Sequence, residues 1–97
     1  MAVKRDEFID SMLEGMLMLE TTDECYNFLK DLCTIREIKS MAQRYCVARM
    51  LTDKKVYSEI VEKTGASTAT ISRVNRSIND GADGYSVVFA RLKEKGK

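Results

Sequence analysis

Hydrophobic residues recur along the chain at intervals of three and four, which is the spacing of one face of an α-helix. Stretches with this spacing are separated by polar or glycine-containing breaks and predict about six helices. We expect them at about residues 6–19, 21–33, 34–51, 56–63, 67–79 and 85–95. The run Val87-Val88-Phe89 is the one competing strand signal, and it is too short to form a sheet. The pattern therefore predicts an all-α fold in a single domain, residues 1–97.

Residues that favour helix ends stand at the breaks in this pattern. In the stretch Thr21-Thr22-Asp23-Glu24 a threonine can cap a helix N-terminus, and the two acids suit its positive end. Thr34 and Glu37 have the spacing of a capping box. Gly65 is expected to end the fourth helix in the left-handed conformation, and the glycine-rich segment 79–84 is a further break.

The first predicted helix is apolar around most of its circumference. Its apolar residues are Phe8, Ile9, Met12, Leu13, Met16, Leu17 and Leu19. This band is too wide for a helix that has one side in water. Burial inside a monomer would cover it, but burial against a second subunit explains it better, because the run Met16–Leu19 needs covering on all sides.

Residues 56–79 have the pattern of a helix-turn-helix unit, two short helices joined by a tight glycine turn. With the unit starting at Tyr57, Ile60 and Val61 face inward from the first helix. Ile71 and Val74, three residues apart, face inward from the second, which Ser67 or Thr68 can cap. Apolar contacts of this kind would hold the two helices at a fixed angle.

The outward positions of the second helix are small or basic. They are Ser67, Thr68, Ala69, Ser72, Arg73 and Arg76, in a stretch from Gly65 to Ser77 that contains no carboxylate. Small residues let a helix approach base edges in the major groove, where hydroxyl groups, an alanine methyl and arginines can contact bases or phosphates. Lys54 and Lys55, just before the unit, are expected at phosphates. The alternative is a helical hairpin whose arginines are merely solvated.

The charge of +1 is unevenly distributed along the chain. Residues 1–37 hold nine acids and four bases, whereas residues 38–97 hold twelve bases and six acids. A basic second half suits a protein that meets an anionic partner such as DNA.

The chain contains no histidine, so a catalytic Ser-His or Cys-His arrangement cannot form within it. Cys25, Cys33 and Cys46 lack the close pairs of a zinc site, and we expect reduced thiols that act as small buried hydrophobic groups. We therefore predict no enzyme, no metal site and no cofactor. The apolar tract at 16–19 is too short to cross a membrane, so the expected location is the cytoplasm.

The segment 57–73, YSEIVEKTGASTATISR, resembles the Trp-repressor-like family, and within it the YerC/YecD-type proteins of bacteria. The resemblance extends from the first helix to about Tyr85. It implies an intertwined, all-helical homodimer that binds double-stranded operator DNA as a transcriptional regulator. It also implies two recognition helices about one DNA turn apart, roughly 34 Å.

The resemblance extends to a pocket in which the founding repressor of this family binds tryptophan. The positions that correspond to this pocket are Thr34, Arg44, Thr70, Arg73, Val74 and Ser77. Val74 departs from the pattern, because the repressors of the family have glycine against the ligand. The segment from Arg44 to Ala69 is also one residue shorter. A valine side chain would occupy the ligand space, so we predict no tryptophan binding.

Three functional hypotheses remain. The first is a dimeric, sequence-specific DNA-binding regulator, a repressor, without tryptophan as corepressor. The second keeps DNA binding and adds tryptophan or another small-molecule effector. The third is a helical adaptor that uses the same unit to bind protein.

Overall fold

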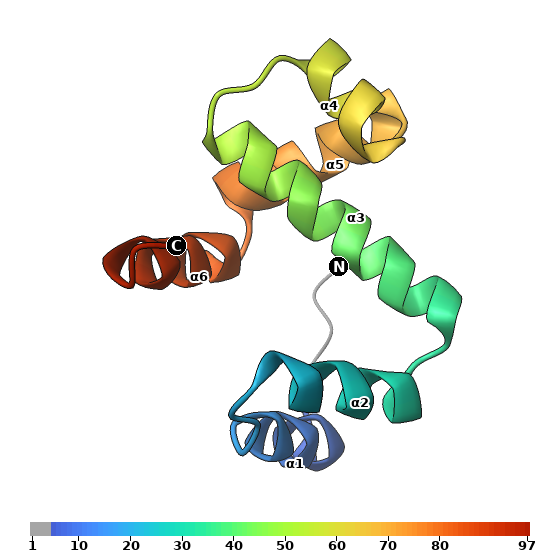
Figure 1. Cartoon of the computed structure of the whole chain (residues 1–97), viewed down its shortest axis with the longest axis vertical. Coiled ribbons are helices and arrows are strands. Elements are labelled where there is room, and N and C mark those ends of the chain that lie inside the picture. Colours follow the sequence, from blue (N-terminus) through green and yellow to red (C-terminus); the bar gives the residue numbers. More distant parts are fainter. Residues whose placement is uncertain (1–4) are drawn as a thin grey trace. The chain divides into compact units, whose positions relative to one another are not determined.

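The computed structural model describes residues 5–97, which form six α-helices and no strand. The helices are α1 (Glu7–Met16), α2 (Thr22–Leu32), α3 (Ile35–Thr52), α4 (Tyr57–Thr64), α5 (Thr68–Asp80) and α6 (Gly84–Glu94) (Figure 1). The predicted all-α class and the order of the elements are confirmed. None of these helices is long and apolar enough to cross a membrane.

The chain divides into two compact units, residues 1–38 and 39–97. The first comprises α1, α2 and the first turn of α3. The second comprises the rest of α3 together with α4, α5 and α6. Each unit is described by itself below.

In the first unit the threonine that caps α2 is Thr21. Thr21 Oγ1 accepts a hydrogen bond from the backbone N–H of Glu24 at 3.1 Å. Helix α1 ends at Met16, before the predicted end at about Leu19, because Met18 and Leu19 donate to the carbonyls of Gly15 and Met16 and so tighten the last turn. Neither α1 nor α2 contains a fully buried residue. The large apolar surface of this unit is therefore not covered by the unit itself.

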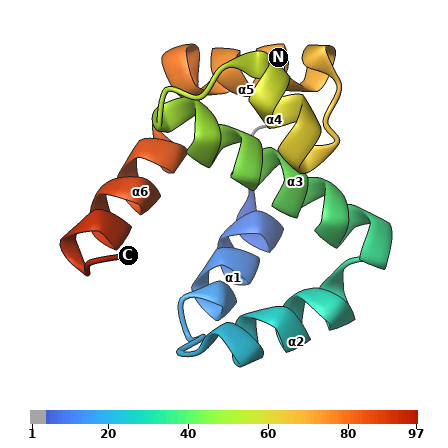
Figure 2. The same ribbon diagram turned by 45° about the horizontal axis from the view of Figure 1, so that its top comes forward.

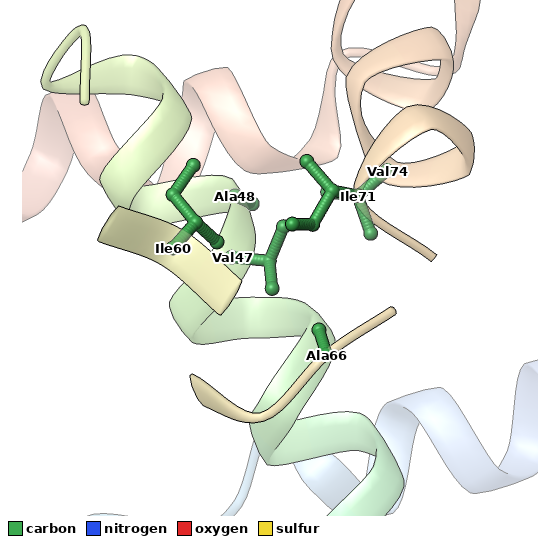
Figure 3. Close-up of a cluster of buried hydrophobic side chains, with 6 residues drawn as sticks. All are labelled: Val47, Ala48, Ile60, Ala66, Ile71 and Val74. Atoms are coloured by element: carbon green, nitrogen blue, oxygen red, sulfur yellow. The ribbon is translucent and has the colours of Figure 1, made fainter. Parts of the chain in front are cut away.

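The second unit has a small core between α3, α4 and α5. It consists of Val47, Ala48, Ile60, Ala66, Ile71 and Val74, each at most 2% exposed, and Figure 3 shows them converging from the three helices and the turn. The predicted inward positions Ile60, Ile71 and Val74 are confirmed. Val61 was wrongly placed in the core, since it is exposed on α4. Val47 on α3 is fully buried as well.

Helix α6 packs on α3 through aromatic side chains. The Phe89 ring meets the edge of the Tyr45 ring at a centroid distance of 5.4 Å and stacks on Tyr85 at 5.9 Å. Helix α5 ends at Asp80 and is capped by Gly81, where a Cβ atom would overlap the carbonyl oxygen of Ser77, so glycine is required there. In Figure 2, α6 (red) follows α5 (orange) after this break in the helix.

The cysteines differ from the prediction of buried thiols. Cys25 and Cys46 are exposed and Cys33 is half-buried, and all three are free. The prediction of buried thiols is therefore wrong for Cys25 and Cys46.

Candidate nucleic-acid interface

The turn between α4 and α5 is fixed by backbone geometry and by the hydroxyl group of Ser67. Gly65 ends α4 with φ 72°, the predicted left-handed conformation, and its N–H donates to the Val61 carbonyl at 2.8 Å. Ser67 then caps α5, since its Oγ accepts from the backbone N–H of Thr70 at 3.1 Å. Of the two predicted capping residues, Ser67 is the one used.

All six predicted outward residues of α5 and its N-cap are exposed: Ser67, Thr68, Ala69, Ser72, Arg73 and Arg76. The buried side chains of Ile71 and Val74 hold the opposite face of α5 against α3 and α4. Within residues 5–97 neither Arg73 nor Arg76 takes part in an ion pair, so both guanidinium groups are available to a partner.

The two helices of the unit differ in charge. Helix α4 exposes the carboxylates of Glu59 and Glu62, whereas α5 has no acid before Asp80 at its last position. An anionic partner would therefore be attracted to α5 and repelled by the middle of α4. The hydroxyl of Ser67 is already engaged with Thr70, which leaves Thr68, Ala69 and Ser72 as the small groups free to approach a surface.

The segment Asp53–Val56 connects α3 to this unit and exposes both predicted lysines. Lys54 has φ 65°, and its N–H donates to the Leu51 carbonyl, while the N–H of Lys55 donates to the Met50 carbonyl, both at 3.0 Å. These bonds form a Schellman cap with Lys54 at the position that favours glycine. The sequence pattern gave no indication of this strained conformation.

Replacing Lys54 by glycine is expected to raise the free energy of unfolding by about 1 kcal/mol, because glycine adopts the left-handed conformation without strain. The same change should weaken DNA binding and lower the salt slope by about 1 if the ammonium group contacts a phosphate. Lys54→Ala is the matched control, since it removes the charge and keeps the strain. Urea unfolding and salt titrations of DNA binding give the two readouts. Equal stability of the two variants would contradict the strain argument.

The residues matched to the tryptophan pocket are divided between the two units. Thr34 lies in the first, and the others lie in the second, Arg44 on α3 and Thr70, Arg73, Val74 and Ser77 on α5. Val74 is 2% exposed and packs in the core.

Several polar groups of this set already have local partners. Arg44 Nη1 donates to Ser40 Oγ at 2.8 Å. Thr70 Oγ1 accepts from Ser67 Oγ at 3.1 Å, and Ser77 Oγ donates to the Arg73 carbonyl at 3.3 Å. These bonds stabilise the helices themselves and indicate a local structural role for the hydroxyl groups.

Thr34 forms the predicted capping box with Glu37. Thr34 Oγ1 accepts from the Glu37 N–H at 3.1 Å, and the Thr34 N–H donates to Glu37 Oε1 at 2.8 Å. Hydrogen bonds from the backbone and side chain of Thr34 lower the pKa of the Glu37 carboxyl from its ordinary value. Its contribution to stability is therefore present above the unfolded-state pKa and is lost as the pH falls through the folded-state value.

Glu37→Gln should accordingly reduce the loss of stability of the protein between about pH 6 and about pH 3, because glutamine can accept the same N–H without titrating. Urea unfolding of both proteins at each pH measures the difference. Glu20→Gln, with an exposed acid outside this capping box, is the control. Identical pH profiles for wild type and Glu37→Gln would contradict the assignment.

Two residues that hold the turn were missed by sequence reasoning. Gln43 on α3 donates from Nε2 to the Thr64 carbonyl at 3.1 Å, and Thr64 Oγ1 accepts from the Ala66 N–H at 3.1 Å. The available signals were a polar residue one turn before Val47 and a threonine next to the turn glycine. Neither signal identifies a partner, because Gln43 and Thr64 are far apart in the sequence.

The Trp repressor protein family matches residues 7–93 of the chain. The uncharacterized protein YerC of Bacillus subtilis (strain 168) is 50% identical over 90 residues, which cover 93% of this chain and 86% of YerC. The crystal structure of a TrpR-like protein from Eubacterium eligens ATCC 27750 has a TM-score of 0.89 at 52% identity and covers 92% of both chains. A candidate Trp repressor from Staphylococcus aureus has a TM-score of 0.88 at 44% identity, over 92% of this chain and 89% of that one. The chain therefore belongs to the Trp repressor family, a family of DNA-binding regulators, and to its YerC-type branch.

Proposed function

We propose that the protein is a sequence-specific transcriptional regulator, a repressor, that binds double-stranded operator DNA through α5. The observation that carries this proposal is the outer face of α5. It exposes Thr68, Ala69, Ser72, Arg73 and Arg76, with no acid among them, while the opposite face is locked in the core. A helix of this kind can enter the major groove with its small N-terminal residues at the bases and its arginines at guanine or phosphate.

The proposal includes a homodimer. Support comes from the first unit, in which Phe8, Leu17 and Met18 are 80%, 79% and 74% exposed. Apolar surface of this extent on residues 5–38 requires a cover, and an intertwined second copy would supply one. A two-fold symmetric dimer would read a palindromic site with its recognition helices about one DNA turn apart. Because the proposed partner is operator DNA, the proposed location is the cytoplasm.

Selection of bound sequences from a random DNA pool, followed by salt titration on the selected site, tests the proposal. A palindromic consensus and a loss of affinity of roughly 10³–10⁵ between about 50 and about 200 mM salt are expected for a reader with several phosphate contacts. Sedimentation equilibrium should give twice the chain mass. An absence of DNA binding at low salt would contradict the proposal and leave the adaptor role.

We further propose that tryptophan is not a corepressor. Val74 fills a position where a ligand would need space, and its side chain is part of the core. Calorimetric titration of tryptophan and related aromatic compounds should give no heat of binding. Stoichiometric heat with tryptophan would overturn this part of the proposal and would establish an effector-responsive regulator.

A further inference from the structure

Gln43 links α3 directly to the turn of the helix-turn-helix unit. Its side chain is half-buried, and Nε2 donates to the backbone carbonyl of Thr64 at 3.1 Å. The last carbonyl groups of a helix have no intrahelical donor, so a side chain from elsewhere has to satisfy them or water does. For the Thr64 carbonyl of α4 this donor is Gln43 on α3. Gln43 lies one turn before the buried Val47, which anchors this part of α3 in the core.

Thr64 also connects the end of α4 to the residue before the cap of α5. Its hydroxyl donates to the Ile60 carbonyl at 2.7 Å and accepts from the Ala66 N–H at 3.1 Å. Ala66 is 2% exposed and belongs to the core, and Ser67, the next residue, caps α5. A displacement of the Thr64 carbonyl would therefore shift Ala66 and, through it, the first turn of the recognition helix.

We propose that Gln43 is a positioning residue for DNA recognition, which sets the orientation of α5 through the carbonyl of Thr64; this inference rests on the proposed DNA-binding function. Only a donor can serve in this place, because a carbonyl oxygen accepts and does not donate. The small residues at the N-terminus of α5 make the position of this helix critical. Their short side chains cannot reach bases if the helix moves outward.

Two substitutions separate the hydrogen bond from the bulk of the side chain. Gln43→Met keeps the length and removes the donor, so affinity for the selected DNA site should fall by about fivefold at neutral pH. In Gln43→Glu the ionised carboxylate faces a carbonyl oxygen and cannot donate, whereas the protonated acid can. Its affinity relative to wild type at the same pH should be low at about pH 8 and should recover at about pH 4, below the ordinary glutamate pKa of about 4.3.

Thr52→Val is the control for general loss of stability. It removes another side-chain to backbone bond of α3, from Thr52 Oγ1 to the Ala48 carbonyl at 2.8 Å, at the last residue of the helix. This variant should bind DNA within about twofold of wild type when both proteins are fully folded. Equal losses in Thr52→Val and Gln43→Met would overturn the positioning role.

Hydrogen exchange of the free protein provides a readout that needs no DNA. The Ala66 amide should exchange faster in Gln43→Met than in wild type, because this substitution releases Thr64. In Thr52→Val the exchange rate of the Ala66 amide should equal that of wild type. If wild type binds no DNA, the proposed function fails, and the exchange rate at Ala66 still decides whether Gln43 holds the turn. If Gln43→Met does not fold, the comparison of Gln43→Glu at two pH values decides it. Unchanged exchange at Ala66, or a Gln43→Glu variant without acid recovery, would overturn the inference.

Discussion

Arg76→Ala is expected to weaken DNA binding by about 5- to 150-fold while leaving the unfolding midpoint unchanged, and Arg73→Ala should behave in the same way. The magnitude follows from the loss of one arginine contact to guanine or phosphate, worth about 1–3 kcal/mol. Stability should not change, because both guanidinium groups are exposed and lie outside the core. Fluorescence anisotropy with the selected DNA site and urea unfolding measure the two quantities.

The kind of contact can be read from the same titrations. An arginine at a phosphate should weaken all sequences alike and lower the salt slope by about 1, whereas an arginine at a base should relax the sequence preference at one position. Arg91→Ala on α6 is the matched control, since it removes an exposed arginine from outside the recognition helix. If both α5 variants bind as tightly as wild type, α5 is not the reading element.

Helix ends were predictable because their signals are local. The capping box at Thr34 and Glu37, the cap at Thr21 and the left-handed Gly65 each depend on residues within one turn. The end of α1 was not predictable in this way. The apolar residues from Leu17 to Leu19 continue the helical spacing, while the backbone leaves it through tighter hydrogen bonds.

The inner face of α3 could not be selected from periodicity. This helix carries apolar residues on most sides, from Met41 and Tyr45 to Val47, and only contacts with α4 and α5 decide that Val47 and Ala48 are buried. Tyr45 and Met41 stay partly exposed within the chain. A helix that is apolar on several faces can pack against several other helices. The sequence of one chain does not show which helix packs on which face.

The outward face of α5 was predicted because its inward face has an unambiguous pattern. Ile71 and Val74, three residues apart, fix the rotation of the helix, and the exposed positions follow from it. The support of the turn was not predicted, because the bond from Gln43 to Thr64 connects residues that no local pattern relates. Positions of functional side chains were thus accessible from the sequence, and the contacts that hold them were not.

Val74→Gly is expected to lower the free energy of unfolding by about 3 kcal/mol. The valine side chain is 2% exposed, so its loss removes about 2 kcal/mol of burial together with the cavity that remains. Glycine inside a helix adds about 1 kcal/mol. Urea unfolding at a fixed protein concentration measures the sum. For a domain of this size that is a large part of the total stability.

Two further variants on the same helix separate these contributions. Val74→Ala should show the loss of burial alone, and Ser72→Gly, at an exposed position, the effect of glycine alone. If Val74→Gly is no less stable than Ser72→Gly, then Val74 does not contribute to the core. The family resemblance implies glycine at this position in tryptophan-binding repressors, so the Val74→Gly variant also tests the steric argument. A tryptophan site that appears in calorimetry only with Val74→Gly would assign the loss of the effector to this side chain, whereas binding to the wild type would show that the valine leaves room for it.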